Sequence, residues 1–355
     1  LTIFVVLEGA RRAVGLGMTI IGAVFIAYAF AGSRGELPFL ADWMPGIMNH
    51  RGYSLERVAS QMTLGAEGIF GIPLGVAATF VFIFVLFGAF LEVTGAGKFF
   101  IDLAYAATGK QRGGPAKAAV IASAGMGSIS GSAIANVVTT GAFTIPLMKK
   151  LGYRPAQAGG IEAAASTGGQ IMPPLMGAGA FLMSEFTRVP YVDIVLVSIF
   201  PAILYFGAVY LLVHIAAVKQ GMTGLSSEEL PSVRAVLAGG WHFLLPLVAL
   251  VWLLVAGYSP MRVGFYAIAA IIAAASARAL WVFFANGPTA GGFVALCQRG
   301  VALTLQALEL GARNAVAVSM ACAVAGIIVG VVGLTGLVLK FSAMMIAFSG
   351  GNIVL

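Results

Sequence analysis

Seven apolar stretches, each long enough to cross a lipid bilayer, constrain the fold of this chain more than any other feature. A membrane-spanning helix needs about 17–25 mostly apolar residues. Such stretches occur at 13–32, 69–93, 158–186, 191–216, 240–257, 262–284 and 312–336. The sequence therefore predicts an all-α integral membrane protein with about seven spans.

The composition agrees with this prediction. Hydrophobic residues make up 60% of the 355 residues and charged residues only 9%, whereas a soluble domain is about 25% charged. The net charge of +7 does not indicate a nucleic-acid partner, because the basic residues lie in short loops between apolar runs, as the positive-inside rule expects. The two cysteines and three histidines have no metal-site or nucleophile–base spacing, so we predict no enzyme activity and no cofactor.

The segment 115–148 is also apolar, but several glycines interrupt it. Both of its flanks are basic, with Lys110, Arg112 and Lys117 before it and Lys149, Lys150 and Arg154 after it. A single span would place these flanks on opposite sides of the membrane, so two basic flanks favour a re-entrant helical hairpin with both ends cytoplasmic. Such backbone is tolerated at depth only where protein or water surrounds it.

The tip of the predicted hairpin concentrates small polar residues around glycine. The candidate ligands and turn residues are Ser128, Ser130, Gly131, Ser132, Asn136 and Thr139, with Thr140 one residue further on. Hydroxyl, amide and unwound backbone oxygens suit a hard cation without adding charge, which favours an ion site. The alternative is a tightly packed helix pair, because small residues let membrane helices approach closely.

A second element, 155–186, is predicted to be a discontinuous helix. Its centre contains Ser166, Thr167, Gly168, Gly169 and Pro173. Proline removes a backbone donor and clashes with the preceding turn, and broken helices expose charged ends to ions. The alternative is a simple proline kink.

Two carboxylates lie near the ends of this discontinuous helix. Glu162 precedes its polar centre and Glu185 lies close to its far end. Carboxylates near helix ends usually reach the interface between membrane and water. A direct role of Glu162 in ion or substrate binding is therefore the less favoured alternative.

A weak internal echo suggests an inverted repeat. The sequence from Thr94-Gly95 to Gly109 recurs, with a one-residue slip, from Thr335-Gly336 to Gly350. The predicted topology places the first copy inside and the second outside, as in many secondary transporters, although two Ala/Gly-rich stretches can also resemble each other by chance. A second hairpin would then be expected after Gly350, and the sequence ends at Leu355.

The motifs at 127–153 (GSISGSAIANVVTTGAFTIPLMKKLGY) and 162–174 (EAAASTGGQIMPP), with EGIFGIPLGV at 67–76, resemble the large membrane subunit of tripartite ATP-independent periplasmic (TRAP) transporters. The resemblance covers at least residues 50–355. It is closest to the branch in which small and large membrane subunits are fused and the binding proteins are of the TAXI type.

The resemblance implies a sodium-coupled permease of the bacterial or archaeal inner membrane, with an elevator mechanism and no cofactor besides the coupling ion. It also implies a periplasmic TAXI-type binding protein, a carboxylate substrate, surrounding lipid, and a small-subunit portion that is fused or separate. The residues that would hold the first sodium and border the substrate are Ser130, Gly131, Ser132 and Asn136 of the hairpin with Ser166, Thr167, Gly168 and Pro173 of the broken helix. Sodium itself would lie near Ser130, Ser132, Asn136 and Thr167. Asn136 stands where dicarboxylate-type relatives often carry Asp. Which ion or substrate this position would prefer is therefore left open.

The resemblance also divides the chain into expected segments. They are the last small-subunit helix (1–35), a periplasmic loop and arm (36–66), a first repeat (67–218), a cytoplasmic linker (219–239), connecting spans (240–294) and the start of a second repeat (295–355). The alternatives are a sodium/dicarboxylate symporter of the divalent-anion type, which works without a binding protein, and a non-transporting membrane scaffold.

Overall fold

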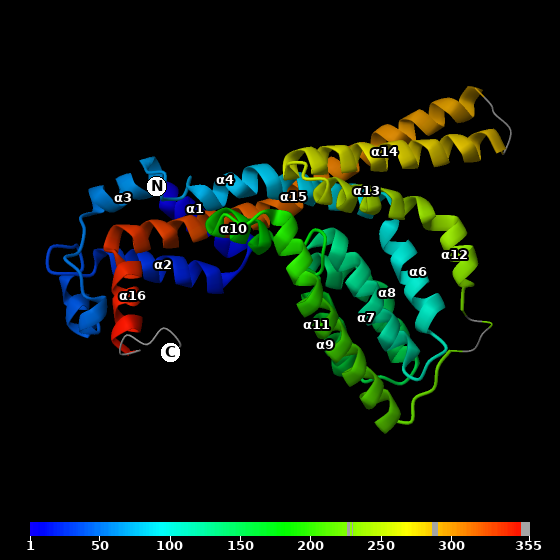
Figure 1. The fold of residues 1–355 in the computed structure, drawn as a ribbon, viewed down its shortest axis with the longest axis horizontal. Helices are drawn as coiled ribbons and strands as arrows, with labels where there is room; N and C mark the ends of the chain where they lie inside the picture. Colours follow the sequence, from blue (N-terminus) through cyan, green and yellow to red (C-terminus); the bar gives the residue numbers. More distant parts are fainter. Residues whose placement is uncertain (226–227, 229, 286–289, 349–355) are drawn as a thin grey trace. The chain divides into compact units, whose positions relative to one another are not determined.

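The computed structural model describes residues 1–225, 228, 230–285 and 290–348, and within these ranges it contains helices and no strands (Figure 1). The predicted all-α fold is therefore confirmed. Of the features predicted above, Ser226, Ser227 and Glu229 of the linker and Ser349 and Gly350 of the echo lie outside the described residues, as do 286–289 and 351–355.

Five helices in the described part of the chain are long and apolar enough to cross a membrane. They are Ile72–Thr94, Tyr191–Lys219, Val233–Val255, Pro260–Ala285 and Gly292–Thr335. Each overlaps a predicted span, although Gly292–Thr335 begins 20 residues before the predicted 312–336. The predicted span 13–32 contains a helix of 15 residues, α2 (Leu16–Phe30), and 158–186 is interrupted, so the count of seven spans stays a prediction.

The chain forms two compact units, which are described separately. The first comprises Leu1–Thr79 and Arg313–Leu355. Its elements are α1 (Thr2–Ala13), α2, η1 (Pro38–Trp43), η2 (Gly46–Met48), α3 (Leu55–Leu64), α4 (Ile72–Val76), the end of α15 (Ala290–Thr335) and α16 (Leu337–Phe348). Its core joins Val58 and Met62 of α3 to Val324 and Ile327 of α15.

The second unit comprises Phe80–Ala312. Its elements are the end of the π-helical turn η3 (Ala77–Val81), α5 (Phe82–Thr94), α6 (Ala96–Thr108), α7 (Gly114–Ser130), α8 (Ala133–Lys150), α9 (Pro155–Thr167), η4 (Gly168–Gln170), α10 (Ala178–Thr187), α11 (Tyr191–Lys219), α12 (Val233–Gly240), η5 (Trp241–Phe243), α13 (Leu244–Val255), α14 (Pro260–Ala285) and the start of α15. The predicted division into segments stays a prediction, because contact density does not report which segments descend from a repeat.

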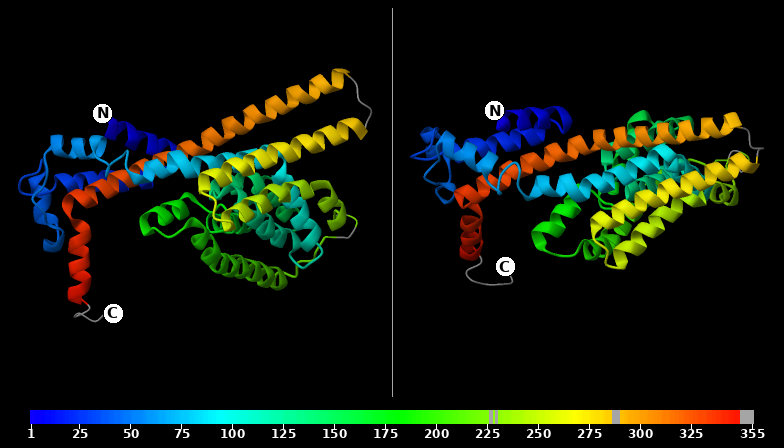
Figure 2. Two further views of the ribbon diagram at one scale, coloured as in Figure 1. Left: turned by 45° about the horizontal axis from the view of Figure 1, so that its top comes forward. Right: turned by 90° about the horizontal axis from the view of Figure 1, so that it is seen from above.

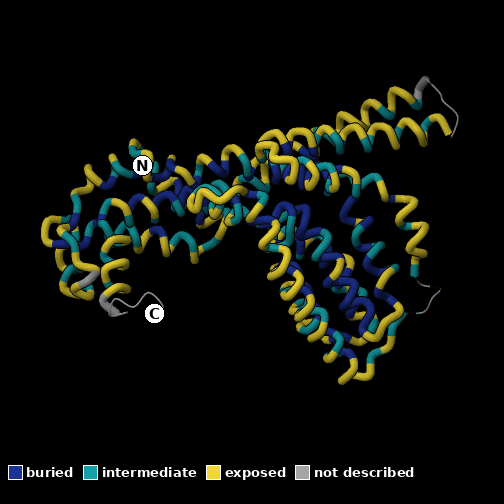
Figure 3. Tube along the Cα trace, viewed as in Figure 1, coloured by how far each residue is buried: buried dark blue, intermediate teal, exposed yellow. Residues whose placement is uncertain are grey.

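Helix α7 is the centre of the second unit. It packs against α6, α8, α9 and α11 (Figure 1), and 13 of its 17 residues are buried (Figure 3). A helix that is enclosed on all sides needs small residues to let its neighbours approach, and α7 consists largely of Ala, Gly and Ser. The first arm of the predicted hairpin is thus the core of this unit, whereas its second arm, α8, has five buried residues among 18.

Other helices of the second unit keep apolar side chains on the outside. In α11 only seven of 29 residues are buried, and exposed residues include Val197, Phe200 and Leu212. Helix α14, which packs along α13 (Figure 2), has four buried residues among 26. A soluble protein would not leave such continuous apolar faces uncovered, whereas lipid covers them without cost.

The two copies of the internal echo have the same local structure. Helix α5 ends at Thr94 and α6 begins after Gly95, whose φ is 103°; α15 ends at Thr335 and α16 begins after Gly336, whose φ is 65°. In both copies the threonine hydroxyl donates to its own helix, to Phe90 O at 2.8 Å and to Val331 O at 2.8 Å respectively. A left-handed glycine lets one helix stop and another start at a new angle. The inverted relation of the two copies stays a prediction.

Candidate functional site

The hairpin turns at two residues, Gly131 and Ser132, between α7 and α8. Gly131 has a φ of 59°, and a Cβ atom there would overlap the carbonyl oxygen of Met176, so only glycine fits. The Ser132 hydroxyl caps α8 by accepting from the backbone N–H of Ala135 at 3.3 Å. The backbone N–H of Ser132 in turn donates to the Ser130 hydroxyl at 3.4 Å. These two hydroxyls are partly buried at the tip.

The discontinuous helix is observed where glycine and proline predict it. Helix α9 ends at Thr167, the short turn η4 follows, and α10 begins only at Ala178. The intervening segment is held by Tyr191 of α11, whose buried hydroxyl donates to Pro174 O at 2.9 Å or to Leu175 O at 2.7 Å. A helix end leaves backbone N–H and C=O groups without partners in the helix. The interrupted segment brings such groups near the hairpin tip, where the carbonyl oxygen of Met176 lies beside Gly131.

Two glycines bring the hairpin and the break together. A Cβ atom on Gly169 would lie 2.8 Å from Gly127 Cα and 3.1 Å from Asn136 Nδ2. Gly168, beside it, lies against the ring of Tyr205. A side chain on Gly127 or Gly169 would separate α7 from η4, and one on Gly168 would separate η4 from α11. Both contacts therefore depend on glycine.

Asn136 is completely buried beside this glycine contact. Its Nδ2 donates to Ser123 O at 2.8 Å, but its Oδ1 has no hydrogen-bond partner among the described residues. A buried, unsatisfied acceptor costs about 1–3 kcal/mol, and buried polar groups are normally paired. An amide oxygen is also a good ligand for a hard cation. The residue therefore fits the predicted ion site.

The other predicted site residues do not all converge on Asn136. The Thr167 side chain is exposed and donates to Ala163 O at 2.7 Å, and Ser128 donates to Gly125 O at 2.7 Å. Thr139 lies 3.0 Å from the carboxylate of Glu92, to which it can donate. Ser166 is buried, but its hydroxyl contacts Glu162. Pro173 lies in the segment between η4 and α10.

Glu162 differs most from its sequence-based prediction. We expected its carboxylate to reach the interface, but it is 0% exposed and receives hydroxyls from three helices. The signal in the sequence was the set of hydroxyl residues at 123, 140, 144 and 166, which lie on the facing sides of helices that only the fold brings together. Glu185, by contrast, pairs with Arg188 at 3.5 Å near the surface.

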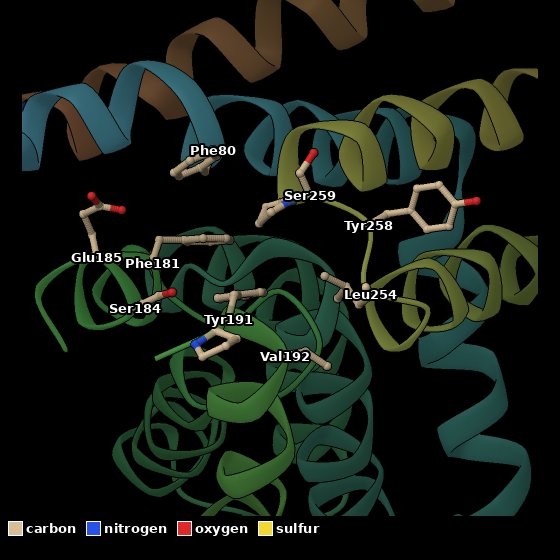
Figure 4. A pocket seen from close by; sticks show the side chains of 12 residues that line it. Phe80, Phe181, Ser184, Glu185, Tyr191, Val192, Leu254, Tyr258 and Ser259 are labelled. Atoms are coloured by element: carbon tan, nitrogen blue, oxygen red, sulfur yellow. The ribbon is translucent and has the colours of Figure 1, made fainter. Parts of the chain in front are cut away.

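A separate cavity of about 330 Å³ lies in the same unit (Figure 4). Phe181, Ser184 and Glu185 of α10 line one side, and Tyr258 and Ser259 of the α13–α14 turn line the other. None of the predicted site residues lies in its wall. The cavity therefore does not replace the hairpin and break as the candidate site.

The described fold, with its apolar helices, helical hairpin and broken helix, is that of a multi-pass membrane protein. Comparison with protein families extends this result. The family model "Tripartite ATP-independent periplasmic transporter, DctM component" matches residues 1–355. The chain belongs to this family, whose members are transporter permeases.

Curated relatives agree over shorter segments. The "C4-dicarboxylate TRAP transporter large permease protein DctM" of Pseudomonas aeruginosa is 31% identical over 195 residues, covering 54% of this chain and 44% of that protein. The "Putative TRAP transporter large permease protein" of Haemophilus influenzae is 28% identical over 154 residues, covering 43% and 34%. The "2,3-diketo-L-gulonate TRAP transporter large permease protein YiaN" of Escherichia coli is 33% identical over 91 residues, covering 26% and 21%. The matches thus span less than half the length of these relatives.

Proposed function

We propose that this chain is part of the permease of a sodium-driven secondary transporter that imports a small carboxylate across the bacterial inner membrane. A periplasmic binding protein, which we infer to be of the TAXI type, delivers the substrate, and a small membrane subunit, fused or separate, completes the permease. The family assignment supports the binding-protein requirement. The substrates named for two relatives, C4-dicarboxylates and 2,3-diketo-L-gulonate, support a carboxylate.

The observation that carries the sodium proposal is the unpaired oxygen of Asn136. It is buried where the hairpin contacts the break, within the unit that α7 organises. Sodium is a hard cation that accepts neutral oxygen ligands. The tip hydroxyls belong to Ser130, the last residue of α7, and Ser132, which lies four residues before Asn136. The donor set therefore suits a monovalent cation, and Gly168, Gly169 and Pro173 supply the break that lets backbone carbonyls take part.

An elevator mechanism is compatible with this arrangement. In such a mechanism a unit that holds the ion and substrate moves as one body against a static scaffold. The second unit has a core around α7, the first arm of the hairpin. We propose that it contains the part of the permease that moves.

Sodium-gradient uptake of labelled carboxylates into proteoliposomes tests the proposal. The full-length permease is reconstituted with its binding protein and compared with Asn136→Ala, Ser132→Ala and the control Thr187→Ala. The Thr187 hydroxyl bonds only local backbone, because it donates to Met183 O and accepts from the N–H of Val189. Loss of one ligand, about 0.5–1.5 kcal/mol, should raise the sodium concentration for half-maximal uptake about two- to tenfold in the first two variants only.

Three outcomes separate the alternatives. Uptake that is indifferent to sodium would overturn the ion-site assignment. Uptake that proceeds without any binding protein would favour a symporter of the divalent-anion type. No transport of any carboxylate by the reconstituted complex would favour the scaffold.

A further inference from the structure

The first turn of α7 contains a buried lysine that pairs with no carboxylate among the described residues. Lys117 is 3% exposed. Its ammonium group donates to Gln111 Oε1 at 2.9 Å and lies 5.0 Å from the centre of the Tyr210 ring. One acceptor and one ring engage only part of its three N–H donors. Since lysine is almost never fully buried unless it is paired, this ammonium group calls for a further partner.

Two other buried polar atoms in this part of the fold have no hydrogen-bond partner among the described residues. They are the hydroxyl oxygen of Tyr153 and Nδ1 of His214. Tyr153 is 3% exposed, and a Cβ atom on Gly113, the residue before α7, would lie 2.8 Å from its hydroxyl oxygen. Buried polar groups are normally paired. Both groups can donate a hydrogen, the imidazole when its proton is on Nδ1.

The Lys117 side chain extends toward the Tyr153 hydroxyl. Gly113 and Lys117 are four residues apart, so they lie on one face of the helix. Helical side chains point back toward the helix N-terminus, and the hydrogen bond of Lys117 to Gln111 has this direction. The ammonium group therefore lies on the side of Gly113, which the Tyr153 hydroxyl also approaches.

Helix α11 packs along α7 and contacts this same face (Figure 1). The Tyr210 ring lies under the Lys117 ammonium group. Ala217 lies against Gly113, where an added Cβ atom would be 2.5 Å from the Ala217 Cβ atom. His214 is four residues after Tyr210 and three before Ala217, so it lies on the same side of α11. Its unpaired Nδ1 therefore belongs to the same group of polar atoms.

The chain around these groups has no acidic side chains. No Asp or Glu occurs in 103–161 or in 194–219. The buried carboxylate of Glu162 bonds Ser123 of α7, which lies six residues, or about 9 Å, along the helix from Lys117. Because the Lys117 side chain points away from Ser123, this carboxylate is too far for an ion pair. The positive end of the α7 dipole adds to the potential of the lysine.

We propose that the start of α7 is a binding site for a small inorganic anion of the size of chloride. The anion accepts hydrogens from the Lys117 ammonium group, the Tyr153 hydroxyl and the His214 imidazole, and it neutralises a buried charge. The close approach of α7 and α11 at Gly113 favours a single ion over an organic molecule.

The anion site is separate from the candidate sodium site. Lys117 is in the first turn of α7 and Ser130 is its last residue, so the two lie about 20 Å apart along the helix. The inference therefore does not rest on the proposed transport function. It can be tested at constant sodium and without a transported substrate.

Chloride titration of the purified full-length permease tests the site. Sodium is held constant while chloride replaces gluconate, and both the thermal unfolding midpoint and the binding of radiolabelled chloride are measured. We expect saturable binding and a midpoint that rises with chloride concentration. Lys117→Met keeps an apolar stem without the charge and should abolish both effects. The control Lys149→Met, at an exposed lysine in the last turn of α8, should keep them.

Tyr153→Phe is a milder variant, because it removes a single oxygen atom. It should raise the chloride concentration for half-maximal binding about two- to tenfold, which a hydroxyl with a purely structural role would not do. Absence of chloride binding to the wild type would mean that these groups bond water only. Equal chloride binding by the wild type and Lys117→Met would place the ion elsewhere, and either result would overturn the proposal. Stabilisation by phosphate or acetate but not by chloride would overturn the assignment to a single-atom anion.

Discussion

Replacing Gly169 by alanine should disrupt the contact between the hairpin and the broken helix. The new Cβ atom would lie 2.8 Å from Gly127 Cα, whereas ordinary carbon contacts begin near 3.4 Å. The backbones of α7 and η4 would have to separate by roughly 0.6 Å, because neither partner is a flexible side chain. Overpacking of this kind costs about 1–3 kcal/mol.

Gly160→Ala provides the matched control on α9. A Cβ atom there meets nothing within 4 Å. Both alanines lower the conformational entropy of the unfolded chain, which stabilises the fold by about 0.4–1 kcal/mol. The difference between the two variants is then the overpacking cost alone. Thermal unfolding of the detergent-purified permease should give a lower midpoint for Gly169→Ala than for Gly160→Ala.

The sodium requirement gives a second measurement on the same pair. The Cβ atom of Gly169→Ala would also lie 3.1 Å from Asn136 Nδ2, so it should displace the candidate ligand and raise the sodium concentration needed for uptake. Equal midpoints and equal sodium requirements in the two variants would refute the argument that close backbone approach builds the site.

Two further predictions concern other parts of the chain. Tyr191→Phe removes the donor to Pro174 O and Leu175 O and should cost about 1–2 kcal/mol in thermal unfolding; an unchanged midpoint would contradict the anchoring role. Burial, and then Lys340, lower the pKa of His50. Below about pH 6.5 the unfolded chain therefore takes up the proton first and stability falls. His50→Gln should remove that fall, and an identical pH profile would contradict it.

The breaks in this fold could be predicted from the sequence because local chemistry determines them. Gly131 needs a left-handed φ and the space beside Met176, and the Gly-Gly and Pro-Pro pairs interrupt α9 whatever surrounds it. The same holds for the turn between α5 and α6. There Thr94 is the last residue of one helix, and the left-handed Gly95 precedes the next.

Hydropathy was less reliable about the extent of the spans. The apolar run at 13–32 forms a helix of only 15 residues, because Gly15 begins it with a φ of 120° and extended backbone at Ala31 ends it. The predicted span 312–336 is only part of a longer continuous helix, α15, which begins at Ala290. Hydropathy measures transfer to lipid and not the dihedral angles at which a helix starts or stops.

The burial of Glu162 was not predicted, because its place near one end of the predicted helix 155–186 favoured an exposed carboxylate. Its burial is decided by Thr140 and Thr144 on α8 and by Ser123 on α7, which approach it only because α9 packs into the hairpin. Gly141 permits that approach, since a Cβ atom there would lie 3.1 Å from Glu162 Cγ. A single sequence does not reveal which faces of three helices meet.

Ser123 connects the candidate ion ligand Asn136 to the buried carboxylate of Glu162. Its carbonyl holds the Asn136 amide at 2.8 Å, which leaves the amide oxygen free for a cation, and its hydroxyl lies 3.2 Å from Glu162. Thr140 makes a second link, because its hydroxyl can turn either to Glu162 or to Asn136 O. A change in the hydrogen bonding of Glu162 therefore changes which groups Thr140 and Ser123 bond, and through them it reaches Asn136.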